Sequence, residues 1–157
     1  ATEIIAKARP EMIIGTGTVL TPEDMTRSAN AGARFAVSPG LTPTLADAAR
    51  PYFDSCPLLP GTATASDVMA AMEWGFERVK FFPAEAAGGI PMLKSLYGPL
   101  PQVRFCPTGG IKLSTAPDYL SLPNVFCVGG SWLTPSDKLR DGDWAGVTAI
   151  AKEAAGA

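Results

Sequence analysis

The chain has 157 residues, 46% of them hydrophobic, and its 13 Lys+Arg and 15 Asp+Glu residues give a net charge of −2. This length and apolar fraction fit a single domain, residues 1–157, with a substantial core. The sequence has no basic block, no apolar run long enough to span a membrane and no signal-peptide layout, so we expect neither a nucleic-acid nor a membrane partner.

The complement of histidine and cysteine excludes several kinds of site. Histidine is absent, which rules out Ser-His and Cys-His nucleophile pairs and histidine-containing metal sites. Cys56, Cys106 and Cys127 each fall in an apolar strand-like run, and no Cys-x-x-Cys spacing occurs. Because free cysteine is commonly a small buried hydrophobe, we expect three reduced core residues in a cytoplasmic protein, with no redox role and no metal.

Strand-like apolar runs alternate with helix signals along the chain. The expected strands are 12–15, 34–40 with its loop, 57–61, 78–82, 103–107 and 125–128. The expected helices are 1–9, 21 to about 31, one from 42, 64–74, about 91–97, about 114–120 and a tail after 143. Strand starts recur roughly every 21 to 25 residues, which predicts a parallel α/β sheet covered on both faces.

Two arrangements fit this alternation: an open doubly wound sheet and a (β/α) barrel. Every strand ends in Gly, Pro, Thr or Ser, so polar and flexible residues gather at one edge. In a barrel that edge is the C-terminal face, where active sites lie. Since a closed barrel of this kind needs eight units, we expect about six of the eight to be present, with roughly 45 to 50 residues of the N-terminal two units lacking upstream.

One lysine interrupts the apolar strand 78–82. Side chains alternate along a strand, so Lys80 and Phe82 share one face. An ammonium in such a run is costly unless it is paired or becomes neutral, and a neutral amine in a dry pocket is what Schiff-base chemistry requires. The alternative is a structural lysine that pairs with a carboxylate or reaches water along its stem.

Glycine-rich segments follow three of the strands. Residues 108–110 and 129–131 end consecutive strands, where paired glycines let backbone N–H groups approach a phosphate; the alternative is two tight turns. Threonine hydroxyls in 15–18 could hold a substrate carboxylate or cap the next helix. Glu85, beyond the lysine strand, could be a base or an ion-pair partner.

Five motifs together resemble the 2-keto-3-deoxy-6-phosphogluconate (KDPG) aldolase family. They are GTGTVL at 15–20, SPGLT at 38–42, VKFFPAE at 79–85, VRFCPTGG at 103–110 and GGSWL at 129–133, in that family's order. The resemblance covers essentially the whole chain. It implies a class I aldolase of the Entner–Doudoroff pathway on a TIM (β/α)8 barrel, usually a homotrimer, whose substrates are a phosphorylated keto acid and pyruvate. It implies no cofactor, and 4-hydroxy-2-oxoglutarate is a second substrate in the family.

Carried over by position, the resemblance makes Lys80 the Schiff-base lysine. It assigns substrate binding to Thr18 (pyruvate carboxylate), Pro39 and Phe82 (pyruvyl pocket), and Gly109, Gly110 and Ser131 (phosphate), with Thr108 and Gly130 beside them. The family's general acid/base glutamate and a nearby arginine lie on the second strand of the barrel, which this sequence does not contain, and the role is not transferred to Glu85.

Two other functions fit the same residues. One is another phosphate-binding TIM-barrel lyase or isomerase that uses Lys80 electrostatically rather than covalently. The other is an inactive phosphate-binding fragment, favoured by the absent second-strand glutamate. Trapping of a pyruvate imine separates the covalent mechanism from the first alternative, and a turnover assay beside a phosphate-binding titration separates it from the second.

Overall fold

The computed structural model describes residues 1–156, which form parallel strands with helices between them. The strands are β1 (Gly15–Thr16), β2 (Phe35–Val37), β3 (Leu58–Leu59), β4 (Gly61–Thr62), β5 (Arg78–Phe81) and β6 (Arg104–Pro107). They pair in the orders β1-β2-β3 and β4-β5-β6, and every pairing is parallel. The predicted α/β class with a parallel sheet is therefore confirmed.

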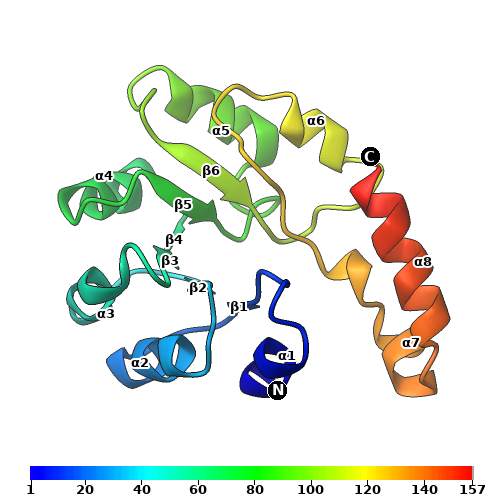
Figure 1. Ribbon diagram of the computed structural model, residues 1–157. Coiled ribbons are helices and arrows are strands. Elements are labelled where there is room, and N and C mark those ends of the chain that lie inside the picture. The colour runs from blue at the N-terminus through cyan, green and yellow to red at the C-terminus, as the bar shows by residue number, and fades with distance from the viewer. Residues whose placement is uncertain (157) are drawn as a thin grey trace.

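The helices follow the predicted order. They are α1 (Thr2–Ala8), α2 (Pro22–Asn30), α3 (Pro43–Ala49), α4 (Ala65–Glu73), α5 (Gly89–Tyr97), α6 (Ala116–Leu120), α7 (Ser136–Asp141) and α8 (Trp144–Ala155), with short 3₁₀ turns η1 (Arg50–Tyr52) and η2 (Ser131–Leu133). The strands lie side by side in chain order, and α2 to α5 lie outside them (Figure 1). Over residues 1–156 the strands do not close into a barrel, and no helix there is long and apolar enough to cross a membrane.

Local capping explains why two of the helices begin where the sequence predicts. The Thr21 hydroxyl accepts a hydrogen bond from the Asp24 amide at 3.1 Å, and the Asp24 carboxylate accepts one from the Thr21 amide at 3.2 Å. Thr64 and Asp67 make the same reciprocal pair at the start of α4. Each box satisfies backbone donors that the first turn of a helix leaves free, so both starts are encoded locally.

Two predicted strands differ from the observed structure in how they pair with their neighbours. The run 57–61 is divided into β3 and β4 at Pro60, whose ring nitrogen has no hydrogen to donate to a neighbouring strand. The run 125–128 is not a strand: it makes only isolated parallel bridges, Phe105 to Val125 and Thr108 to Gly129. Between the two bridges the chain advances three residues from Phe105 to Thr108 but four from Val125 to Gly129. The extra residue interrupts the regular pairing, as a β-bulge does.

The first strand and the C-terminal region also depart from prediction. The strand expected at 12–15 is observed at Gly15–Thr16, and Met12 and Ile13 are exposed. Helix α7 was not predicted, because Ser136–Asp141 is short and carries few apolar residues.

The two faces of the strands have different surroundings. Ala36, Val79, Phe81 and Phe105 are fully buried, in one core cluster with side chains of α2 to α5. The alternate residues, such as Val37, Lys80 and Cys106, line a cavity instead. The expectation that helices cover both faces is therefore wrong for residues 1–156: the faces are apolar for different reasons, one as core and the other as cavity wall.

Candidate active site

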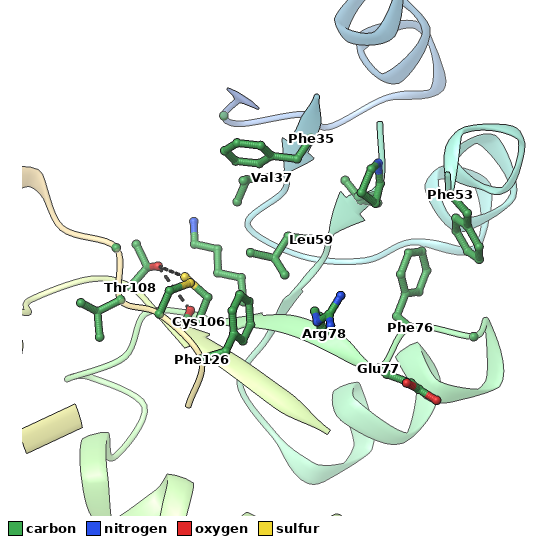
Figure 2. A pocket seen from close by; sticks show the side chains of 18 residues that line it. Phe35, Val37, Phe53, Leu59, Phe76, Glu77, Arg78, Cys106, Thr108 and Phe126 are labelled. Atoms are coloured by element: carbon green, nitrogen blue, oxygen red, sulfur yellow. Dashed lines mark hydrogen bonds between the residues drawn. The ribbon is translucent and has the colours of Figure 1, made fainter. Parts of the chain in front are cut away.

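A largely apolar cavity of about 850 Å³ lies on the inner face of the strands. Lys80 lines it. The apolar side chains in the same wall include Phe35, Val37, Leu59 and Phe126 (Figure 2). An apolar concave surface with a few convergent polar groups is the usual form of a small-molecule site. The cavity therefore places the lysine of the strongest sequence motif in the setting expected of a ligand pocket.

Lys80 is held between two neighbouring strands. In register it lies beside Gly61 of β4 and Cys106 of β6, and its amide donates to the Pro60 carbonyl at 2.8 Å. Its own carbonyl accepts a hydrogen bond from the Thr62 hydroxyl at 3.1 Å. Backbone pairing on both sides fixes the direction in which the side chain leaves the strand, so the amine points into the cavity.

The electrostatic surroundings of the amine favour its neutral form. None of the salt bridges within residues 1–156 involves Lys80. Burial lowers the pKa of Lys80, and the nearby Cys106 sulfur opposes this shift only in part. The Nζ atom lies 4.2 Å from the centroid of the Phe82 ring, a contact that stabilises a cation modestly. Burial prevails, and the alternative of a lysine paired with a carboxylate is excluded for these residues.

Pro39 and Phe82 come together in a second, smaller cavity of about 270 Å³, which Gly61 and Thr62 also line. A Cβ atom at Gly61 would lie 2.1 Å from the Pro39 carbonyl oxygen, so only glycine allows this close approach of the backbone. The Lys80 amine lies over the Phe82 ring, at 4.2 Å from its centroid. Of the two predicted pyruvyl-pocket residues, Phe82 thus contacts the predicted nucleophile, and Pro39 lies with Phe82 in the second cavity.

Thr18 is the one non-glycine residue in residues 1–156 with a positive φ, at +58°. A β-branched residue in this conformation is strained by roughly 1–3 kcal/mol. The loop is held by a hydrogen bond of 3.0 Å from the Val19 amide to the Val37 carbonyl. Gly17, next to Thr18, lines the main cavity, whereas Thr18 itself does not. Strain of this kind is typical of residues held for ligand binding.

Replacing Thr18 with glycine should raise the free energy of unfolding by about 1 kcal/mol, because relief of strain exceeds the entropy cost of glycine. Pyruvate binding should weaken about ten-fold if the hydroxyl contacts the carboxylate. Denaturant titration and a pyruvate titration measure the two effects. Thr148→Gly, at an exposed position within α8, is the control and should lose about 0.5–1 kcal/mol. Destabilisation of Thr18→Gly by a similar amount would contradict the strain argument.

The two predicted glycine loops lie side by side. Thr108 pairs with Gly129, and the Gly129 amide donates to the Pro107 carbonyl at 2.9 Å. Gly109 and Gly110 have φ values of +103° and +83°, which glycine adopts without strain. Gly130 directly precedes η2, which opens at Ser131. The structure therefore brings these predicted phosphate residues to one edge of the strands, although of them only Thr108 lines the main cavity.

Glu85 is hydrogen-bonded to Tyr119 and does not line the cavity that contains Lys80. Its carboxylate accepts a hydrogen bond from the buried Tyr119 hydroxyl, and its amide donates to the Gly109 carbonyl at 3.1 Å. Burial, with help from the Glu85 carboxylate, raises the pKa of the Tyr119 hydroxyl. These contacts hold the 108–110 loop against α6 and leave Glu85 outside the main cavity.

The cysteines only partly match the prediction. Cys56 and Cys106 are buried and Cys127 is half-buried, and all three are free thiols. Cys106 and Cys127 both line the main cavity, so Cys127 is not the core residue that its apolar surroundings suggested. Sequence reasoning missed this pair and Gly17 as cavity residues. The register of β5 with β6 places Cys106 beside Lys80, so this pairing would have identified Cys106 as a cavity residue.

A family model described as aldolase, KDPG and KHG aldolase, matches residues 1–150. The chain belongs to this family. The KHG/KDPG aldolase of Escherichia coli is 50% identical over 154 residues, which are 98% of this chain and 71% of the relative. KDPG aldolase from Legionella pneumophila, in a crystal structure with pyruvate captured at low pH as a covalent carbinolamine intermediate, is 46% identical with a TM-score of 0.90, and the match covers 95% of this chain and 71% of that one.

The 2-keto-3-deoxy-6-phosphogluconate aldolase of Zymomonas mobilis, in a crystal structure with 3-phosphoglycerate, is 49% identical with a TM-score of 0.87, over 96% of this chain and 69% of that one. Membership in the aldolase family thus rests on both sequence and backbone. In this aldolase chain, the cavity lysine and the two glycine loops occur at the positions where the motifs predict them.

Proposed function

We propose that this chain acts as a class I aldolase, a lyase that cleaves KDPG reversibly to pyruvate and glyceraldehyde 3-phosphate through a Schiff base on Lys80. The observation that supports this proposal most strongly is the lysine itself: it is half-buried in the wall of an apolar cavity, has no carboxylate partner among residues 1–156 and has a lowered pKa. Such an amine is an activated nucleophile toward a carbonyl carbon. The family relatives, which are named as KDPG aldolases, support the same reaction.

The chemistry follows from the neutral amine. Lys80 Nζ attacks the C2 carbonyl of the keto acid to give a carbinolamine, and loss of water gives an iminium ion. The iminium accepts the electron pair of the breaking C3–C4 bond while the C4 hydroxyl loses its proton, which releases the aldehyde and leaves an enamine of pyruvate. Protonation at C3 and addition of water return pyruvate and the free lysine. No carboxylate of residues 1–156 pairs with Lys80, so we assign these proton transfers to no residue of this chain.

Binding groups on either side of Lys80 would position the substrate. Pro39 and Phe82 would shape the pocket for the pyruvyl end, and Thr18 would donate to its carboxylate. The phosphate would be held by the loops that contain Thr108, Gly109, Gly110, Gly130 and Ser131. Binding at a phosphate remote from the reacting bond helps to orient that bond, which is how such contacts raise the rate as well as the affinity.

The rate of pyruvate adduct formation should rise with pH, because only the neutral amine attacks and its fraction increases as pH passes through the pKa of Lys80. Burial lowers that pKa, so the midpoint should fall below the ordinary lysine value of about 10.4. The Cys106 sulfur also acts on the pKa of the amine, and double replacement of Cys106 and Cys127 by serine should retain a lowered midpoint. Adduct rates from pH 6 to 11.5, with reductive quenching, measure it; a midpoint at or above 10.4 would contradict an amine activated by burial.

We also propose a barrel architecture, a cellular location and an oligomeric state for this protein. The parallel strands would form the wall of a TIM (β/α)8 barrel, to which a single domain at residues 1–157 supplies about six units, and the protein would be a cytoplasmic homotrimer. The arc of strands with helices outside it supports the barrel (Figure 1). Light scattering on a sizing column tests the trimer, and a monomeric mass would contradict it.

A coupled assay tests the overall reaction. Pyruvate released from KDPG is measured with lactate dehydrogenase, and glyceraldehyde 3-phosphate with its own dehydrogenase. Equal release of both products is expected. Phosphate binding without release of either product, in a folded protein, would instead favour the inactive binding module.

A further inference from the structure

Two thiols lie on adjacent chain segments in the wall of the main cavity. Cys106 is in β6, and Cys127 is in the run 125–128 that bridges to β6 on either side of it. Backbone hydrogen bonds enclose the pair, from the Phe126 amide to Phe105 at 3.1 Å and from the Gly129 amide to Pro107 at 2.9 Å. Neighbouring strands are about 4.8 Å apart, within the roughly 4.4–6.8 Å between Cα atoms that a disulfide spans.

The side chains of the two residues lie in the same part of this wall. Both line the main cavity, each affects the pKa of the other, and the Thr108 hydroxyl lies 3.8 Å from the Cys106 sulfur (Figure 2). Cys56, by contrast, is in the core cluster and does not line the cavity. The chain therefore has one thiol pair that can react together and one thiol that is separate from it.

The surroundings make the two thiols unequal. The Cys127 thiol, the Thr108 hydroxyl and the nearby Lys80 lower the pKa of Cys106 against the effect of burial. Cys106 and burial raise the pKa of Cys127. Cys106 is therefore the thiol of the pair that ionises more readily. An attacking thiolate next to a resolving thiol is the arrangement of oxidant-sensitive cysteine pairs.

We propose that Cys106 and Cys127 form a modification site at which hydrogen peroxide, a two-electron oxidant, produces a reversible disulfide in the cavity wall. The Cys106 thiolate attacks one peroxide oxygen, so that an S–O bond forms, the O–O bond breaks and the departing hydroxide takes up a proton as water. The Cys127 sulfur then attacks the sulfenic acid; the S–S bond forms, and the hydroxyl leaves as water with the Cys127 proton. Each sulfur loses one electron, and the peroxide gains two.

The disulfide would alter the surface beside Lys80. Lys80 and Cys106 are paired in register and line the same cavity, so oxidation removes a thiolate from the immediate surroundings of the amine. The site thus couples the charge of the cavity wall to the oxidant concentration. It does not rest on the proposed aldolase reaction, because the thiols, their contacts and their chemistry are independent of any substrate.

The test is a titration of the full chain with hydrogen peroxide, followed by iodoacetamide in denaturant, intact mass and peptide mapping. We expect a mass loss of about 2 Da, one labelled thiol (Cys56) in place of three, a 106–127 cross-linked peptide, and recovery of all three labels after dithiothreitol. Cys127→Ser should stop at a sulfenic acid on Cys106 that dimedone captures. Cys106→Ser should keep both remaining thiols, and the control Cys56→Ala should still form the disulfide.

Other results would overturn the proposal. They are three labelled thiols after oxidation of a protein shown by circular dichroism to be folded, a cross-link that includes Cys56, a disulfide between two chains on a non-reducing gel, or equal oxidation of Cys106→Ser. The readout is a mass and not a rate, so a failure here is distinct from a failure of the proposed aldolase function.

Discussion

Replacing Lys80 with methionine will abolish the pyruvate adduct and reduce KDPG cleavage by at least about a thousand-fold, because the covalent route requires the amine. The fold should be retained. Methionine has similar length and suits an apolar wall, and no salt bridge within residues 1–156 is broken by the change. Removal of a half-buried amine from an apolar wall should leave the free energy of unfolding unchanged or slightly higher.

The measurement pairs steady-state cleavage with thermal unfolding, and Lys94→Met is the matched control. Lys94 is exposed on α5 and lies outside the cavity, so its replacement removes the same charge without touching the site. The control should keep its cleavage rate. Substantial cleavage by a folded Lys80→Met protein would instead mean that the lysine acts electrostatically or not at all, as in the alternative lyase or isomerase.

Replacing Gly110 with alanine will lower the preference for phosphorylated over unphosphorylated aldehyde about ten-fold, as the loss of one or two backbone hydrogen bonds to phosphate would. It should also lower the free energy of unfolding by about 1–3 kcal/mol. Gly110 has φ +83°, and an added Cβ would lie 2.6 Å from Glu85 Cγ, in a side chain that Tyr119 holds in place. The loop must therefore move to accept a methyl group.

Gly98→Ala is the control for this change, since Gly98 has φ −59° and nothing lies within 4 Å of the position of its Cβ. It should leave the preference unchanged and raise the free energy of unfolding by about 0.4–1 kcal/mol, because alanine has less conformational entropy to lose than glycine. Ratios of turnover with the two aldehydes, measured beside denaturant titrations, give both quantities. If Gly110→Ala is destabilised but keeps its preference for the phosphorylated aldehyde, the two glycine loops are turns and not a phosphate site.

The elements that the sequence predicted are those with local signals. The Thr21 and Thr64 caps lie within three residues of the groups that they bind, and the alternation along β5 placed Lys80 and Phe82 together. The division of a strand at Pro60 and the interrupted run 125–128 depend on pairing with distant segments. Such pairing leaves little trace in either segment alone.

The same distinction applies to the site. Lys80 was predictable because an amine in an apolar strand is unusual by itself. The placement of Cys106 and Cys127 in one cavity wall depends on how two segments align, and each cysteine alone resembles an ordinary core residue. The positive φ of Thr18 was also beyond prediction, since threonine disfavours it and only the surrounding structure imposes it.

The most direct test of the Schiff-base mechanism is reductive trapping of the wild-type chain. The protein is incubated with pyruvate and borohydride. Its intact mass is then measured, and peptide mapping locates any adduct. We predict one reduced pyruvate adduct, located on Lys80, and none when pyruvate is omitted. Absence of an adduct in a folded protein, or an adduct on another lysine, would contradict the assignment of Lys80 as the nucleophile.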